Sequence, residues 1–84
     1  MNLYLISQST SNGYDTYDSA VVAAISIEAA KLTDPNTYHK NKPITERTYT
    51  DDWVKDPKLV TATLIGKAVE GTQAEVICAS FNAG

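Results

Sequence analysis

Four side chains that could take part in chemistry lie close together early in the chain: Tyr14, Asp15, Tyr17 and Asp18. Two carboxylates can share general acid and base steps, provided that both reach the same substrate. In a strand, however, residues three positions apart face opposite sides of the sheet and lie about 10 Å apart. We therefore predict that Asp15 and Asp18 are solvated acids, which also discourage an edge strand from pairing with other chains.

Tyr14 and Tyr17 offer aromatic rings and hydroxyl groups, both of which suit contacts with a ligand or a protein partner. The alternative is that the two rings close the end of the core while their hydroxyls reach water. Trp53 has the same two interpretations. We predict a binding site from the polar and aromatic residues that are least needed for a core. These residues are Tyr14, Asp15, Tyr17, Asp18, Trp53 and Asn82.

Cys78 and His39 are the only cysteine and histidine, so they are the candidates for a thiol nucleophile and its imidazole base. Cys78 lies in an apolar stretch, residues 76–79, where a buried and inert thiol is expected. His39 stands near Lys40 and Lys42 in a small basic cluster that could contact an anion or simply be solvated. One cysteine and one histidine are too few for a structural zinc site, and the dispersed glycines form no phosphate-binding loop. We predict no catalytic group, metal or cofactor.

The composition limits the class of protein. With 84 residues, 43% of them hydrophobic and 20% charged, the chain resembles one globular domain with a thin core. A net charge of −3 and scattered basic residues argue against binding to duplex nucleic acid. No apolar run approaches the ~20 residues that span a bilayer, and residues 1–6 lack the basic start of a signal peptide. A single cysteine fits a reducing cytoplasm.

The pair Asn12-Gly13 favours a tight type I′ turn between two strands. It predicts a hairpin between a first strand at 2–9 and a second strand at 14–24. A continuous helix over 20–32 is the alternative, because the apolar residues there partly follow a helical period.

Beyond the hairpin, Ser26 is a good N-cap for a short helix, which should end where Asp34 precedes Pro35. Residues 33–52 show no sustained periodicity and predict a long loop. Such a loop is functional or mobile, or it hides a short element, for which 48–50 is the candidate.

Two further strands are predicted at 59–70 and 74–81, joined by a hairpin turn at Glu70-Gly71. The chain is therefore predicted to be a single α+β domain with the element order ββαββ. Two β-hairpins would form a mainly antiparallel four-stranded sheet, with one short helix on one face. The first and fourth strands, which are apolar on both faces, are expected in the middle of the sheet.

Most of the chain outside residues 36–50 resembles other proteins. The segments concerned are 5–8, 12–24 (NGYDTYDSAVVAA), 53–54, 64–68 (LIGKA) and 79–84 (ASFNAG). Together they resemble a group of small hypothetical proteins from bacteriophages and bacterial genomes. The resemblance implies no catalytic or binding residue. It implies that the chain is similar in kind to phage accessory proteins that block host defences, including anti-CRISPR proteins and small-molecule sponges.

We therefore expect a small phage-type binding protein and not an enzyme, located in the cytoplasm of the host bacterium. The expected activity is inhibition of a bacterial anti-phage defence system, in the manner of an anti-CRISPR protein, by binding a host defence protein. One alternative is a sponge that sequesters a nucleotide signal, with tyrosines stacking on the base and Lys40, Lys42 or Arg47 holding phosphate. Another is a structural interaction domain with no role in defence.

A homodimer is also expected, because one short helix cannot cover both faces of a four-stranded sheet. The uncovered face would be an apolar patch larger than monomers usually leave exposed. The alternative is that the loop at 33–52 folds over that face, with Tyr38, Tyr49 and Trp53 as its apolar anchors.

Overall fold

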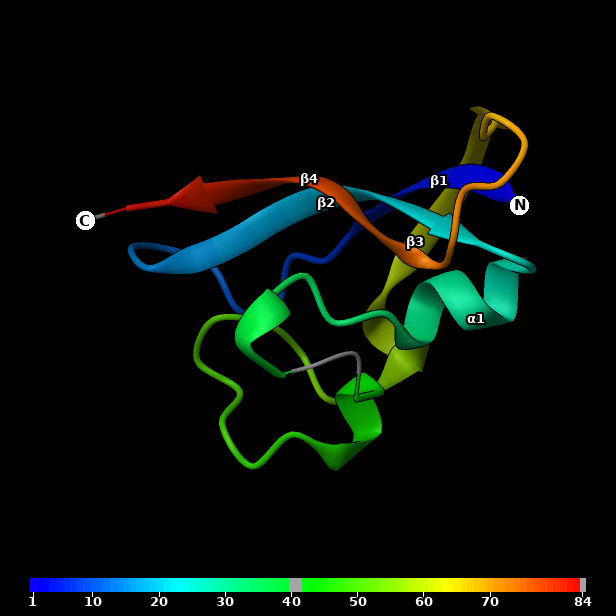
Figure 1. Ribbon diagram of the computed structural model, residues 1–84. Coiled ribbons are helices and arrows are strands. Elements are labelled where there is room, and N and C mark those ends of the chain that lie inside the picture. The colour runs from blue at the N-terminus through cyan, green and yellow to red at the C-terminus, as the bar shows by residue number, and fades with distance from the viewer. Residues whose placement is uncertain (40–41, 84) are drawn as a thin grey trace.

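The computed structural model describes residues 1–39 and 42–83, and Figure 1 shows how its elements are arranged. Within these residues lie four strands and one α-helix: β1 (Asn2–Ser7), β2 (Thr16–Ala24), α1 (Ile27–Leu32), β3 (Thr61–Lys67) and β4 (Glu75–Asn82). Between α1 and β3 lie three short 3₁₀ turns: η1 (Thr37–His39), η2 (Ile44–Glu46) and η3 (Pro57–Leu59). The predicted α+β fold and the order ββαββ are confirmed. In the described part of the chain no helix is long and apolar enough to cross a membrane.

All four strands pair antiparallel, in the spatial order β3-β1-β2-β4. β1 and β2 form the predicted hairpin. β2 extends to Ala24, so the alternative of a continuous helix over 20–32 is wrong. The β-branched pair Val21 and Val22 favours the extended backbone at this point.

The connection within this hairpin differs from the predicted tight turn. Residues 8–15 join the two strands, because polar side chains give this loop hydrogen bonds of its own. The Gln8 amide donates to the carbonyl oxygens of Ser11 at 2.7 Å and Tyr17 at 3.0 Å. Gly13 has a positive φ of 101°, a conformation that glycine adopts without strain.

The predicted second hairpin and the predicted central pair of strands are wrong. β3 and β4 lie at opposite edges of the sheet, beside β1 and β2 respectively. The connection 68–74 crosses the end of the sheet, since a stretch of this length reaches roughly 23 Å and three strand spacings need only ~14 Å. β4 is apolar on both faces although it is an edge strand, so its pattern reflects exposed surface and not a central position. Cys78, expected to be buried, is exposed on this strand.

One face of the sheet, the core face, carries the hydrophobic core. Alternate residues of β1 and β2 point to it, and α1 and the described part of the long loop (residues 33–39 and 42–60) pack on that same face (Figure 1). Ser26 caps α1 as predicted, because its Oγ accepts the backbone N–H of Ala29 at 3.1 Å. The buried cluster consists of Tyr4, Ile6, Ala20, Val22, Ala24, Ala30, Ile44, Trp53, Val54 and Val60.

The long loop lies on the core face, so the alternative that it covers the opposite face is wrong. Trp53 is fully buried there, whereas Tyr38 and Tyr49 stay exposed. Residues 48–50, the candidate for a hidden element, are not in a strand. No described element covers the other face of the sheet, where Leu5 is 40% exposed.

Candidate functional site

Arg47, the only arginine in the chain, is buried in the long loop directly after η2, with 1% of its side chain exposed. Its Nε and Nη2 donate to the two carboxylate oxygens of Asp34 at 2.8 and 3.3 Å. Its Nη1 donates to the carboxylate of Asp52 at 2.6 Å. The planar guanidinium suits this arrangement, because its donors match a carboxylate through two parallel hydrogen bonds.

Arg47 also holds the backbone of the loop. Its Nη1 donates to the carbonyl oxygens of Tyr49 at 2.8 Å and Trp53 at 3.2 Å. Burial lowers the pKa of Arg47, but the hydrogen bonds to Asp34 and Asp52 outweigh this effect and hold the pKa above its ordinary value. One permanently charged side chain therefore joins the start, the middle and the later part of the loop.

His39 completes this cluster. Its Nδ1 lies 2.6 Å from a carboxylate oxygen of Asp34, and its side chain is 32% exposed. The backbone N–H of Asn36 donates to the other oxygen of Asp34 at 2.9 Å. A histidine whose Nδ1 meets a carboxylate keeps Nε2 for a ligand or for water. We call Arg47, Asp34, Asp52 and His39 the Arg47 network.

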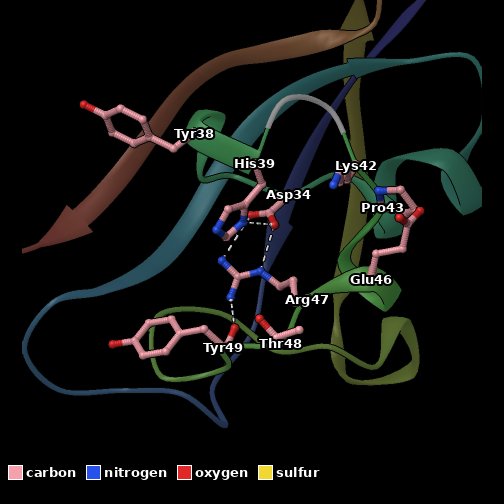
Figure 2. Close-up of a pocket in the computed structure, with 9 residues that line it drawn as sticks. All are labelled: Asp34, Tyr38, His39, Lys42, Pro43, Glu46, Arg47, Thr48 and Tyr49. Carbon is pink, nitrogen blue, oxygen red and sulfur yellow. Dashed lines mark hydrogen bonds and ion pairs between the residues drawn. The ribbon is translucent and has the colours of Figure 1, made fainter.

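A cavity of about 450 Å³ lies beside the Arg47 network (Figure 2). Tyr38 is 90% exposed and Tyr49 is 54% exposed, and Figure 2 shows both side chains projecting in the same direction. The cavity is lined by Asp34, Tyr38, His39, Lys42, Pro43, Glu46, Arg47, Thr48 and Tyr49. Acidic and basic groups both occur, so a ligand would be selected by rings and hydrogen bonds more than by net charge.

The basic cluster predicted around His39 is described only in part. Lys40 lies outside the described residues, and Lys42 lines the cavity. Arg47 is not available to hold phosphate, because its donors are bound to carboxylates and carbonyl oxygens. Cys78 pairs with Val21 in a row of the sheet that faces away from the core, so His39 in the long loop cannot act as its base.

The tip of the first hairpin is held by the last residue of β4. The Asn82 side-chain amide donates to the carbonyl oxygen of Gly13, and the backbone N–H of Asp15 donates to the carbonyl oxygen of Asn82. Thr16 Oγ1 also donates to the Gly13 carbonyl, at 2.9 Å. Asp15 has a positive φ of 58°, which aspartate tolerates better than most residues.

Four residues of the predicted binding site gather at or beside this tip. Tyr14 is 78% exposed, and Asp15, Asp18 and Asn82 are exposed as well. Because Asn82 is bound to both Gly13 and Asp15, the two ends of this group hold a fixed relation to each other. The structure therefore joins residues that are far apart in the sequence into one surface.

The other two predicted residues, Tyr17 and Trp53, lie apart from it. Tyr17 is half-buried against the core, and its ring centroid lies 4.8 Å from that of Phe81. Burial raises the pKa of Tyr17, and the negative charges of Asp52 and Asp34 raise it further. Trp53 is fully buried, and its Nε1 has no hydrogen-bond partner among the described residues. Its ring contributes to the core and not to a surface.

The tip and the long loop meet. Ser11 Oγ donates to the carbonyl oxygen of Thr50 at 2.7 Å, which places the exposed residues on either side of Thr50 beside the hairpin. Tyr38 lies close enough to Tyr17 to raise its pKa. We give the name tyrosine surface to the exposed residues of this end of the molecule: Tyr14, Tyr38, Tyr49, Asp15, Asp18 and Asp51.

The sequence interpretation missed the Arg47 network and the surface position of Tyr38 and Tyr49. A signal for the network was present, because the only arginine lies in an irregular segment with Asp34 near one end and Asp52 near the other. A buried arginine needs carboxylate partners, but Glu46 and Asp51 lie nearer to it along the chain, so the sequence did not show which acids would bind it. The exposure of the two tyrosines had no comparable signal.

Among the residues that the structure describes, no three His, Cys, Asp or Glu side chains gather to hold a metal ion. Comparisons with protein-family models, with curated proteins and with solved structures each found no match.

Proposed function

We propose that this chain is a small binding protein that inhibits a bacterial anti-phage defence system by attaching to a host protein through the tyrosine surface. The observation that carries the proposal is the display of three exposed tyrosines on loops that the protein holds in place. Tyrosine is enriched in protein interfaces, because its ring supplies a large contact area at a small cost in side-chain entropy.

The rigidity of the supporting loops favours binding. Tyr49 lies between Arg47 and Asp52, and its own carbonyl oxygen accepts a hydrogen bond from Arg47. Tyr14 follows Gly13, whose carbonyl oxygen is bound by Asn82 and Thr16. A surface that is ordered before binding loses little conformational entropy when a partner docks.

The charge of this surface indicates the kind of partner. Asp15, Asp18 and Asp51 are exposed close to the tyrosines, and the chain as a whole carries a net charge of −3. Such a surface suits a basic protein surface, for example the nucleic-acid channel of a defence complex, and it disfavours direct contact with duplex nucleic acid. The resemblance to phage proteins supports a partner in the cytoplasm of the host bacterium, and an inhibitor of this kind needs no catalytic group.

A plasmid-interference assay tests the proposal. Bacteria with an active CRISPR–Cas nuclease directed at a plasmid are transformed with that plasmid, with and without the chain, and transformants are counted. We expect the chain to restore transformation and the double variant Tyr14→Ala, Tyr49→Ala to lose most of this effect. The matched control is Ile25→Ala, an exposed apolar residue just after β2, at the end of that strand away from the tip.

Two outcomes would contradict the proposal in different ways. If the chain protects neither against CRISPR–Cas types nor against restriction systems, the anti-defence function is wrong. If it protects and the double variant protects equally well, the function holds and the tyrosine surface is not the binding site. Purified complex should also dissociate as salt is raised, because the acids contribute charge pairing that ions screen.

A second function, sequestration of a nucleotide signal, is favoured by the cavity beside the Arg47 network. Tyr38 and Tyr49 line it as possible stacking rings, and His39 and Lys42 line it as possible partners for phosphate. Calorimetric titration with cyclic and linear nucleotides separates the two functions. The sponge function would be supported if a nucleotide binds and Lys42→Ala weakens its binding about tenfold, roughly 1.4 kcal/mol. The absence of binding heat with every nucleotide would exclude the sponge function.

A further inference from the structure

The strand pairing defines a second face of the sheet that α1 and the long loop do not cover. Along β1 and β2 the side chains alternate, and those that point away from the core include Leu3, Leu5, Val21 and Ala23. The register extends this face to both edge strands. We call it the outer face, and it consists of Leu3, Leu5, Ser7, Ser19, Val21, Ala23, Thr61, Thr63, Gly66, Glu75, Cys78 and Ser80.

The outer face is almost free of charge. Glu75, at one corner, is the only charged residue among its positions, and Asp18 follows beyond its last paired row, Ser7 with Ser19. The solvated face of an antiparallel sheet usually carries polar and charged side chains in alternation with the core. Here the central positions are leucine, valine and alanine instead. The acids other than Glu75 and all seven basic residues lie elsewhere in the chain.

We infer that the outer face packs against the outer face of a second copy of this chain, forming a two-layer sandwich of sheets. A second copy fits because a face with a single charged residue can pack against its own copy under two-fold symmetry without opposing like charges. If the two-fold axis runs parallel to the strands, Glu75 lies over Gly66 of the second copy. If the axis runs across the strands, Glu75 lies over Ser80. In both arrangements the single charge avoids its own symmetry mate.

The size of the face sets the strength of this dimer. Four strands about 4.8 Å apart and roughly 23 Å long give a footprint on the order of 400 Å² on each copy. The total of about 800 Å² lies below the ~1,200 Å² at which stable interfaces begin. The dimer is therefore weak and exchanges rapidly with monomer. It leaves Tyr38 and Tyr49 of both copies free, since they project from the loop on the core face, so a dimer would bind a repeated partner with increased avidity.

Sedimentation velocity from low micromolar to millimolar protein tests the inference. We expect a mass that rises with concentration from the 9.1 kDa of one chain towards twice that value. Thr63→Lys places a charge on the outer face at an exposed position, and Leu5→Lys does so near its centre. Each substitution should weaken association at least about tenfold, because in either arrangement it buries a charge without a partner in an apolar interface. Thr45→Lys, exposed in η2, is the matched control and should dimerise as the unaltered chain does.

Cys78 gives a second measurement that does not depend on a variant. It is the only cysteine and is exposed on the outer face of a single copy. Its rate of reaction with a maleimide should fall as protein concentration rises, and Thr63→Lys should remove this protection. A chain that remains monomeric at millimolar concentration overturns the inference. A dimer that both lysine variants leave intact, with Cys78 still reactive, overturns it as well and indicates pairing through an edge strand.

Discussion

The two loops that form the tyrosine surface are held in opposite ways. Residues 8–15 at the tip are fixed by neutral hydrogen bonds near the surface, including those from Asn82 and Gln8. The long loop is fixed by a buried ion network around Arg47. A neutral hydrogen bond contributes about 0.5–1.5 kcal/mol, and water can replace an exposed one. A buried charge without a partner costs several kcal/mol, and nothing replaces the partner.

Because of this difference, the tip can lose one hydrogen bond without losing the others. The long loop instead keeps or loses its structure as a unit. Arg47 contacts Asp34, Tyr49, Asp52 and Trp53, which lie on both sides of it in the sequence. Loss of Arg47 leaves both carboxylates buried without their cation, and loss of either carboxylate leaves Arg47 with a single buried carboxylate partner. The positions of Tyr38 and Tyr49 therefore depend on the network, whereas Tyr14 is positioned mainly by the hydrogen bonds of the tip.

Removal of Arg47 is expected to have the largest effect. Arg47→Ala leaves Asp34 and Asp52 buried without their cation and should lower the free energy of unfolding by about 3–5 kcal/mol. That is a large share of the roughly 5–15 kcal/mol that stabilises a typical domain. Urea unfolding followed by the fluorescence of Trp53, the only tryptophan and fully buried, measures this loss.

Two further variants show whether unpaired charge causes the loss. Lys55→Ala removes an exposed cation in the same loop and should change stability by no more than about 0.5 kcal/mol. The triple variant Arg47→Met, Asp34→Asn, Asp52→Asn removes all three charges together and should regain much of the stability. If Arg47→Ala costs no more than Lys55→Ala, the network does not hold the loop.

The same contrast explains what could be predicted from the sequence. The strands β1 and β2, the N-cap Ser26 and the end of α1 follow from local patterns, which require no knowledge of distant contacts. The loop 8–15 was also signalled by Gly13, although side-chain hydrogen bonds made it longer than a tight turn. Local chemistry therefore predicted the elements and the general place of the tip.

The strand order and the Arg47 network depend on contacts that local patterns do not report. β3 and β4 have the short connection of a hairpin, yet each pairs with a different central strand. The position of each edge strand depends on whether it pairs with β1 or with β2. No residue in the connection 68–74 indicates that choice. Trp53 was placed at a binding surface because a lone aromatic residue in a loop can be exposed or buried, and only the packing of the long loop distinguishes the two.

A smaller effect is expected at the tip. Asn82→Ala removes the hydrogen bond to the Gly13 carbonyl and should lower the free energy of unfolding by about 0.5–1.5 kcal/mol. The change should be local, because the strands remain paired. Hydrogen exchange should accelerate at the Asp15 amide, which donates to Asn82, and stay unchanged at core amides such as that of Val22. Exchange that accelerates across β1 and β2 would show that the tip and the sheet open together.

The smallest effect is expected at Tyr17, at the junction of the two loops, and it is confined to alkaline pH. Burial, followed by the charges of Asp52 and Asp34, raises the pKa of Tyr17 in the folded protein above its ordinary value of 10.0. The fold thus favours the neutral phenol, and this contribution to stability is present below pH 10 and is lost as the pH rises through the higher folded pKa. The free energy of unfolding should fall more steeply above pH 10 in the unaltered chain than in Tyr17→Phe, as urea titrations at several pH values would show.

The matched control, Tyr14→Phe, removes an exposed phenol of the tip instead and should keep the steep dependence. If the free energy of unfolding depends on pH in the same way for the unaltered chain and for Tyr17→Phe, another group causes the loss of stability above pH 10. The acids of the long loop would then not act on the fold through Tyr17.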